Sequence, residues 1–564
     1  MTGKRHAGDD PPGRRSRARS GAPAGRAPGA LQALAAALFW ACLAGCYDHR
    51  PPALDIAPDV VRPPRSAVIF FPDGMDRDRL RELLAAGRLP NIARRFVAGG
   101  VEVRGAVSSL PSITYPNCSA MITGVFPGHH GILGNFWFDR GSLESRDYMT
   151  LATYRTVNQH LRVPTVYDLL GDAFTVNIQG HTRRGVSQTI EQDLGFAWSW
   201  VSGGFWYADH RVGRCFGELP ALAGRVGRWP ALVMSYFPGV DEVGHRFGTD
   251  SPEYAEALIN IDRTVGGVTE AFDRTGLSAS TIFVLVSDHG MAPVRGEQRI
   301  DLLDWLARRR GMRVRSTPLD VDSYDRRLAR LAGYDAVAGV DAGRVAMIHL
   351  RGTGGWARRP EAAEVRAWVE QSPSLTDLPA VELVAIRDGA DAVTVLSRHG
   401  RARIERRPAA GGSEYRVAGQ EGDPLGYGPY PSARALVERG WHDSRAWLEA
   451  TLQTPCPDFV PQVVEMFDSR RTGDVVAFAA DGWMLYPRER AGHGSCLARD
   501  MAVPMFFAGP DLPRGAAVMA GRLVDLVPTL LELLGRVPPP RETCRMDGVS
   551  LAGQLRAAAP AAAE

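Results

Sequence analysis

The sequence has little excess charge, few cysteines and no long hydrophobic run, and each shortage argues against a class of protein. The 66 Lys and Arg residues nearly balance 63 Asp and Glu residues, so the net charge of +3 indicates no nucleic-acid partner. The 7 cysteines include no Cys-x-x-Cys pair, which argues against a zinc ribbon or a thioredoxin-type site. With 45% hydrophobic and 23% charged residues, the composition is that of a globular protein with one large domain and an insertion, or with several domains.

The N-terminal segment has the parts of a secretory signal. Seven Lys and Arg residues lie within the first 28 positions, and residues 29–46 then contain an uncharged apolar run too short to span a membrane comfortably. The last four residues of this run, Leu43–Cys46, resemble a bacterial lipoprotein cleavage box. The resemblance implies a signal peptide over 1–45, lipidation of Cys46 and a location in the bacterial cell envelope, on either membrane. An ordinary N-terminal anchor, or cleavage beside Ala44, stays open.

The chain after the signal is predicted to begin with a tether. Residues 46–66 are rich in proline and charge, which suits a linker between a lipid and a folded body. Five cysteines remain beyond residue 46, and an exported protein can form disulfides, so at least one thiol stays free or pairs between molecules.

Alternating strand and helix patterns predict an α/β fold. Apolar runs at 67–71, 175–179, 231–237 and 281–288 are typical of buried parallel strands, and helical spacing follows over 77–100 and 251–276. We therefore expect a central, mostly parallel sheet flanked by helices, with a first catalytic part over 67–300.

The pattern changes after residue 300. Short hairpin strands are expected over 382–407 and 413–419, and helices over 430–470, so residues 301–472 are predicted to form a mixed α+β insertion, or cap. Strands at 474–487 and 501–512 and a helix at 523–535 predict a second catalytic part over 473–555. The tail 556–564 is predicted to be disordered.

Ligand-type side chains follow the predicted strands. The carboxyl ends of strands in open α/β sheets are where ligands bind, and carboxylates mixed with imidazoles suit zinc or a similar divalent ion. Each residue alone has a structural explanation, such as a turn, a packed histidine or a surface pair one helical turn apart. Their joint occurrence at four strand ends predicts two three-ligand metal groups, made of Asp73, Asp241, His245, Asp288, His289 and His493.

Thr114 raises a separate question, because it stands before Tyr115-Pro116-Asn117 at the start of a helix-like segment. It could be a helix cap, or its hydroxyl could react. No histidine or lysine stands beside Thr114 as a base, so a reactive hydroxyl would need a metal to stabilise the alkoxide.

The motifs "PDGM", "ITYPN", "DEVGH", "SDHGM" and "GHGS", in this order, resemble the alkaline phosphatase superfamily in its type I phosphodiesterase/nucleotide pyrophosphatase branch. "VDLVPTLLELLG" and "MDGVSL" resemble its C-terminal segment, so the similarity covers about 67–300 and 473–552. It implies a phosphothreonine intermediate on Thr114 and two zinc ions. Asp73, Thr114, Asp288 and His289 would hold one ion, and Asp241, His245 and His493 the other. Asn135 would donate to a non-bridging phosphoryl oxygen.

The sequence is compatible with more than one type of phosphate bond in the substrate. A wall containing Tyr115 and Phe136–Phe138 would suit phosphodiester or pyrophosphate bonds, which we favour, although these aromatic residues fit a core equally well. A phosphomonoesterase would need fixed cations, for which His181, Arg183 and Arg184 are candidates. A sulfatase is disfavoured because "TYPNCS" lacks the required Arg, and a phosphoglycerate mutase would use serine. The remaining alternative is a lipid-anchored zinc protein that binds a partner without catalysis, with the insertion as its working surface.

Overall fold

A computed structural model describes residues 51–150, 153–191, 199–200, 202–319, 323–540 and 543–560. The predicted signal peptide, the lipidation site Cys46 and residues 561–564 lie outside these ranges. Residues 51–564 form one compact unit.

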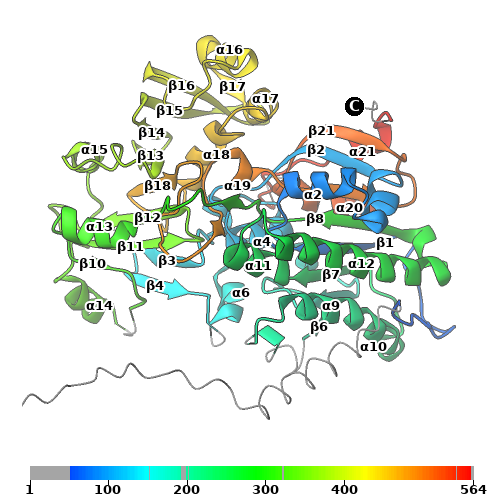
Figure 1. Cartoon of the computed structure of the whole chain (residues 1–564). Helices are drawn as coiled ribbons and strands as arrows, with labels where there is room; N and C mark the ends of the chain where they lie inside the picture. Colours follow the sequence, from blue (N-terminus) through cyan, green and yellow to red (C-terminus); the bar gives the residue numbers. More distant parts are fainter. Residues whose placement is uncertain are drawn as a thin grey trace, which may run out of the picture. The chain divides into compact units, whose positions relative to one another are not determined.

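An α/β core is built on one central sheet (Figure 1). The sheet is mostly parallel, as predicted, and only β20 runs antiparallel to its two neighbours β2 and β8. In the described part of the chain, the strand order across the sheet is β21 (Ala516–Arg522), β2 (Val101–Val107), β20 (Met505–Ala508), β8 (Thr281–Val286), β1 (Ser66–Pro72), β7 (Leu232–Phe237), β5 (Thr175–Ile178) and β6 (Gln188–Ile190).

Helices cover both faces because the central strands are apolar on both faces. In β1, Val68 and Phe70 pack into one core and Ile69 and Phe71 into the opposite one, following the two-residue period of a strand. The first core is covered by α2 (Arg77–Ala85), α3 (Pro90–Ile92), α9 (Phe205–Cys215), α10 (Leu219–Val226) and α12 (Pro252–Arg274). The second is covered by α4 (Thr114–Thr123), α7 (Val166–Leu170), α20 (Leu526–Leu533) and α21 (Ala552–Ala557).

A second sheet, almost entirely antiparallel, holds the insertion. Its order is β10 (Val314–Arg315), β11 (Ala336–Asp341), β12 (Val345–Leu350), β18 (Val475–Ala479), β13 (Val381–Arg387), β14 (Ala392–Ser397), β15 (Gly400–Ala409), β16 (Gly412–Gly422) and β17 (His442–Asp443). The helices beside it are α13 (Leu302–Arg309), α14 (Tyr324–Leu331), α15 (Ala362–Glu370), α16 (Pro431–Arg439), α17 (Ser444–Thr451) and α18 (Phe459–Met466).

One strand differs from the sequence expectation. The run from residue 474 was assigned to the returning catalytic part, but β18 pairs with β12 and β13 in the second sheet. Val476 and Val475 of this strand face two different hydrophobic clusters, so it is buried on both sides as a central strand must be. An apolar run cannot reveal which of two sheets it enters.

Two further expectations were wrong in detail. The helix expected over 77–100 ends at Ala85, because Gly87 has a φ of +66°, and a new helix then starts at Pro90. Residues 51–65 are not a free tether, since Leu54 and Val60 are buried in the core and the Val61 backbone bonds to Gly227.

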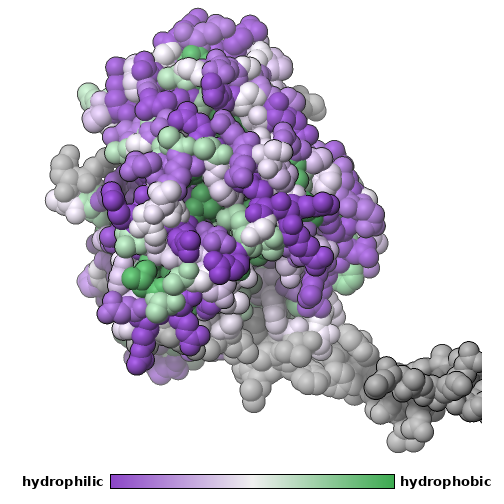
Figure 2. Space-filling model, turned by 90° about the vertical axis from the view of Figure 1, so that its left-hand side faces the viewer, coloured by the Kyte–Doolittle hydropathy of each residue, from purple (hydrophilic) through white to green (hydrophobic). Residues whose placement is uncertain are grey.

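The remaining helices and strands are short. They are α5 (Pro127–His130), β3 (Phe136–Asp139), β4 (Glu144–Asp147), α6 (Val157–His160), α11 (Gly239–Phe247), β9 (Ala292–Pro293), β19 (Ala491–Gly492) and α19 (Ala498–Met501). In the described part of the chain, β3-β4 and β9-β19 form two small separate sheets. The face shown in Figure 2 is largely hydrophilic, with small separate apolar patches. Among the described helices, none is long and apolar enough to cross a membrane.

Candidate active site

The first metal group comprises Asp73, Asp288 and His289, at the ends of the adjacent strands β1 and β8. His289 Nε2 lies 3.2 Å from Asp73 Oδ1 and 3.3 Å from Asp288 Oδ2. The Thr114 hydroxyl is 3.2 Å from the same nitrogen. The sequence prediction for these four residues therefore corresponds to one compact cluster around the His289 ring.

The second metal group comprises Asp241, His245 and His493. Asp241 and His245 lie one turn apart on α11, which follows β7, and their carboxylate and Nε2 atoms are 3.4 Å apart. His493 follows β19 and its Nε2 is 3.6 Å from Asp241. Its ring stacks on His289 with centroids 3.4 Å apart, so the two groups adjoin.

The three histidines present the same nitrogen to the centre of the site. Nδ1 of His245 lies 2.9 Å from the Ala491 carbonyl, that of His289 lies 2.9 Å from the Gly290 carbonyl, and that of His493 lies 2.8 Å from the Ser112 carbonyl. A carbonyl only accepts, so Nδ1 carries a proton, and Nε2 is the nitrogen whose lone pair a metal ion would use. Metal-ligating histidines are held in this way.

The carboxylates of the two groups have unsatisfied oxygens. Oδ1 of Asp73, Oδ1 of Asp241 and Oδ2 of Asp288 are buried without a hydrogen-bond partner in the described structure. Burying a charged oxygen without a hydrogen-bond donor is costly, whereas divalent cations in the two groups would satisfy all three. The donor set, three carboxylates and three imidazoles, therefore fits divalent metal ions of the zinc type.

The proton affinities reflect the crowding of these charges. Burial, and then the charge of Asp73, raises the pKa of Asp288 well above its ordinary value. Burial alone would lower the pKa of His289, but Asp288 and Asp73 raise it to about 9. Cations in these groups would reverse both effects, because they favour ionised carboxylates and neutral imidazoles.

The nucleophile candidate stands at a helix start. Thr114 is the first residue of α4, and its side chain is largely buried, at 8% exposed. The loop before it is held by Asn117, whose amide nitrogen donates to the carbonyls of Ser109, Pro111 and Ile113. These three hydrogen bonds hold the backbone of the loop that leads into Thr114.

Asn135 lies beside Tyr115, the residue that follows Thr114. Its side-chain oxygen accepts a hydrogen bond from the Tyr115 amide at 3.4 Å, so its NH₂ group is left to donate elsewhere. Asp341, at the end of β11 in the insertion, accepts the neighbouring Phe136 amide at 3.3 Å. The insertion thus reaches the loop that holds Asn135.

The proposed substrate-binding residues divide into two sets. The Tyr115 ring packs against Tyr148, and His181 stacks on it with centroids 5.3 Å apart. Burial lowers the pKa of His181 to about 4, so this side chain is neutral at pH 7. Arg184 donates to the Leu161 carbonyl at 2.7 Å, and Arg183 pairs with Glu191. The two arginines are thus engaged in contacts with neighbouring loops.

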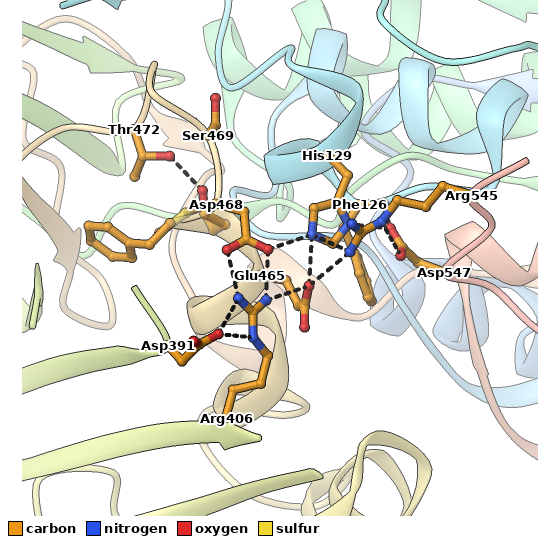
Figure 3. Close-up of polar contacts among 12 residues, drawn as sticks. Phe126, His129, Asp391, Arg406, Glu465, Asp468, Ser469, Thr472, Arg545 and Asp547 are labelled. Atoms are coloured by element: carbon orange, nitrogen blue, oxygen red, sulfur yellow. Dashed lines mark hydrogen bonds and ion pairs between the residues drawn. The ribbon is translucent and has the colours of Figure 1, made fainter. Parts of the chain in front are cut away.

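A third cluster of ligand-type side chains was not foreseen, and Figure 3 shows it. His129 Nε2 lies 2.8 Å from both Glu465 and Asp468, and its Nδ1 lies 2.6 Å from Asp547. Unlike the two metal groups, this cluster contains cations of its own. Arg406 bonds to Asp468 at 2.7 Å and Arg545 bonds to Asp547 at 3.1 Å. We call these six residues the His129 cluster and read it as an ion-pair network.

Some supporting residues gave no sequence signal. Tyr236 donates its hydroxyl to Asp73, and Ser112 holds the His493 ring. Tyr236 lies inside the apolar strand β7, and Ser112 lies in a loop, so neither stands out by type or position.

Comparison with known proteins agrees with this geometry. Residues 67–338 match the family model described as "Type I phosphodiesterase / nucleotide pyrophosphatase". An uncharacterised pyrophosphatase/phosphodiesterase of Schizosaccharomyces pombe is 27% identical over 248 residues, covering 42% of this chain and 47% of that protein. Human ectonucleotide pyrophosphatase/phosphodiesterase family member 7 is 27% identical over 208 residues, covering 35% and 42%. The chain thus spans less than half the length of these relatives.

A solved structure shows the same fold over a longer stretch. Murine ectonucleotide pyrophosphatase/phosphodiesterase 5 superimposes with a TM-score of 0.53 at 15% identity, covering 84% of this chain and 96% of that chain. An inactive threonine-to-alanine variant of the same murine protein, in complex with AMP, superimposes with a TM-score of 0.52 at 15% identity, covering 84% and 96%.

Proposed function

We propose that this protein hydrolyses phosphodiester or pyrophosphate bonds, because residues 67–338 match the family model of the type I phosphodiesterase/nucleotide pyrophosphatase branch. The observation that supports this most directly is the Thr114 hydroxyl, 3.2 Å from His289 Nε2 within the first metal group. A small phosphate ester would be the substrate.

Two zinc ions are the proposed cofactors. Asp73, Thr114, Asp288 and His289 would hold one, and Asp241, His245 and His493 the other. Such ions, when bound, neutralise charge on the attacking and leaving oxygens of an in-line displacement. The unpaired carboxylate oxygens and the three histidines with Nδ1 held by carbonyls support this assignment.

In the proposed reaction, Thr114 Oγ1 forms a bond to phosphorus while the bond from phosphorus to the leaving oxygen breaks. The product is a phosphothreonine ester, and attack of water on its phosphorus then releases the second product and restores the hydroxyl. Asn135, whose side-chain oxygen is held by the Tyr115 amide, would donate its NH₂ to a non-bridging oxygen. A neutral donor of this kind contributes about 10²–10³ in rate.

A diester preference is favoured over a monoester preference. The cations considered for the extra phosphate oxygen are engaged elsewhere, since Arg184 bonds to the Leu161 carbonyl and Arg183 pairs with Glu191. We therefore do not propose Arg183 and Arg184 as substrate-binding residues. Tyr115, 3% exposed and stacked on neutral His181, remains the candidate for contact with an organic group.

Initial rates on bis-p-nitrophenyl phosphate and on p-nitrophenyl phosphate test the proposal, with Thr114→Ala and Arg184→Gln measured alongside. We expect a strong diester preference, abolished in Thr114→Ala and kept in Arg184→Gln. A monoester preference lost in Arg184→Gln would favour a phosphomonoesterase. Bound zinc without Thr114-dependent turnover of either ester would favour a non-catalytic binding protein.

We also propose that the protein is exported and held at the bacterial cell envelope by a lipid on Cys46. The basic, apolar and small-residue segments of the first 46 residues support this. A mature protein that begins at an unmodified Cys46, or before it, in mass spectrometry would contradict the anchor.

A further inference from the structure

Two cysteines that the catalytic site does not use lie side by side. Cys456 Sγ and Cys496 Sγ are 3.8 Å apart, and the two residues are 2% and 0% exposed. Both belong to one hydrophobic cluster, which also contains residues of β13, β14 and α18. No bond joins them in this structure, where the five described cysteines are free thiols.

The two cysteines come from different parts of the chain, one from the insertion and one from the loop after His493. Cys456 lies between α17 and α18, in the segment that accompanies the second sheet. Cys496 lies three residues after His493 of the second metal group. The backbones of the two segments already meet, because the Ala498 amide donates to the Pro455 carbonyl at 2.9 Å.

The loop that ends at Cys496 also fixes the nucleophile segment. Ser112, two residues before Thr114, accepts the His493 Nδ1 proton on its carbonyl at 2.8 Å. Its hydroxyl donates to the Ser495 carbonyl at 2.8 Å and accepts the Gly494 amide at 3.1 Å. A constraint on Cys496 therefore acts on the position of His493 and on the chain leading to Thr114.

We propose that Cys456 and Cys496 form a disulfide in the mature protein, which staples the His493 loop to the segment before α18. The sulfurs need to approach from 3.8 Å to about 2.05 Å, a change that side-chain rotation can supply where the backbones are already hydrogen-bonded. The pairing leaves Cys118, Cys215 and Cys544 outside the disulfide.

The reaction is thiol–disulfide exchange with a disulfide donor of the compartment in which the protein folds. One cysteine thiolate attacks the donor disulfide and releases one donor thiol, and the second cysteine then displaces the other donor thiol. The two protein thiols are oxidised by two electrons and lose two protons, and the donor disulfide is reduced to two thiols. Burial raises the pKa of Cys496, so the exchange is fastest during folding, before this thiol is buried.

Peptide mapping of the full chain tests the pairing. The protein is produced in an oxidising compartment, unfolded without reductant, treated with iodoacetamide and cleaved with trypsin. Cleavage after arginine places Cys456 alone in peptide 446–470 and Cys496 alone in peptide 491–499. We expect one species with the summed mass of both peptides less two hydrogen atoms, which separates on reduction.

Two variants control the assignment. In Cys456→Ala, peptide 491–499 should gain the alkyl group, whereas Cys544→Ser should leave the linked species unchanged. Recovery of both wild-type peptides as separate alkylated species, even after incubation of the protein with glutathione disulfide, would overturn the proposal and leave two packed thiols. Linkage of either peptide to Cys118, Cys215 or Cys544 would overturn it equally.

Discussion

Gly74 lies between the two metal groups, and its lack of a side chain is what lets them approach. A Cβ at this position would stand 2.6 Å from Asp241 Oδ1, and the residue has a φ of +61°. Both the left-handed backbone and the close carboxylate therefore require glycine here.

We expect Gly74→Ala to lose most of its activity because Asp241 must move away from the second metal group. Metal analysis should show one ion lost per chain, and kcat/KM on bis-p-nitrophenyl phosphate should fall by about 10²-fold or more, as for a misplaced catalytic group. Gly87→Ala is the matched control, since its φ is +66° and nothing lies within 4 Å of the added Cβ.

Both variants should lose about 1 kcal/mol of stability from the positive φ. Only Gly74→Ala should lose metal and activity. Equal kinetic losses in the two variants would show that backbone strain, and not the contact with Asp241, controls the site.

The sequence could predict that the residues of the two candidate metal groups lie together, because their types are rare at the ends of apolar strands. Asp73, Asp288 and His289 each follow a run that is buried on both faces. The residues that orient them could not be predicted. Ser112 and Tyr236 act through a carbonyl and a hydroxyl that become neighbours of the site only after distant segments pack together.

At the scale of elements, the His129 cluster joins parts that are far apart in sequence (Figure 3). It brings together α5, the end of α18, β15 of the second sheet and the C-terminal segment. Burial opposes its charge, yet Asp547, Asp468 and Glu465 raise the pKa of His129 to about 11. Arg406 and Arg545 are the cations that face the same carboxylates.

Because of this cluster, the free energy of unfolding should fall as the pH rises into the alkaline range. The folded pKa of about 11 exceeds the unfolded value of 6.5, so the contribution of His129 is complete below pH 6.5 and is lost as pH rises towards 11. We expect His129→Gln to lower the free energy of unfolding by about 3 kcal/mol at pH 6, as for a broken buried ion pair, and by much less at pH 10.

Urea unfolding of both proteins between pH 6 and 10 measures this difference. Arg88→Gln is the control, because its side chain is 52% exposed, pairs with exposed Glu256 outside the cluster, and should change stability by less than about 1 kcal/mol. A difference between wild type and His129→Gln that stays constant with pH would contradict a charged His129.

At the scale of the whole molecule, the two sheets meet at the active site. Ala342, in the turn between β11 and β12, accepts the His493 amide at 3.0 Å, and Asp341 holds the Phe136 amide. The sequence predicted the central sheet and the existence of an insertion from hydrophobic periodicity. It did not predict that β18 would join the second sheet, because strand pairing between distant segments leaves no local pattern.

Metal removal should loosen the whole core, since the ligands come from the ends of β1, β7, β8 and β19. Without cations the buried carboxylates Asp73, Asp241 and Asp288 repel one another, so dialysis against a chelator should lower the melting temperature by several degrees. Zinc should restore it in wild type and in Gly87→Ala, but only in part in Asp288→Asn. Full restoration in Asp288→Asn would contradict the first metal group.

The claim that Thr114 attacks phosphorus is tested most directly by trapping the covalent intermediate. Bis-p-nitrophenyl phosphate is mixed with the zinc-loaded enzyme, quenched with acid within milliseconds and digested with trypsin. We predict a phosphoryl ester on Thr114 in peptide 105–140, formed together with a burst of one p-nitrophenol per active site. Steady turnover with neither burst nor adduct would mean that water attacks the substrate directly, and would contradict the account.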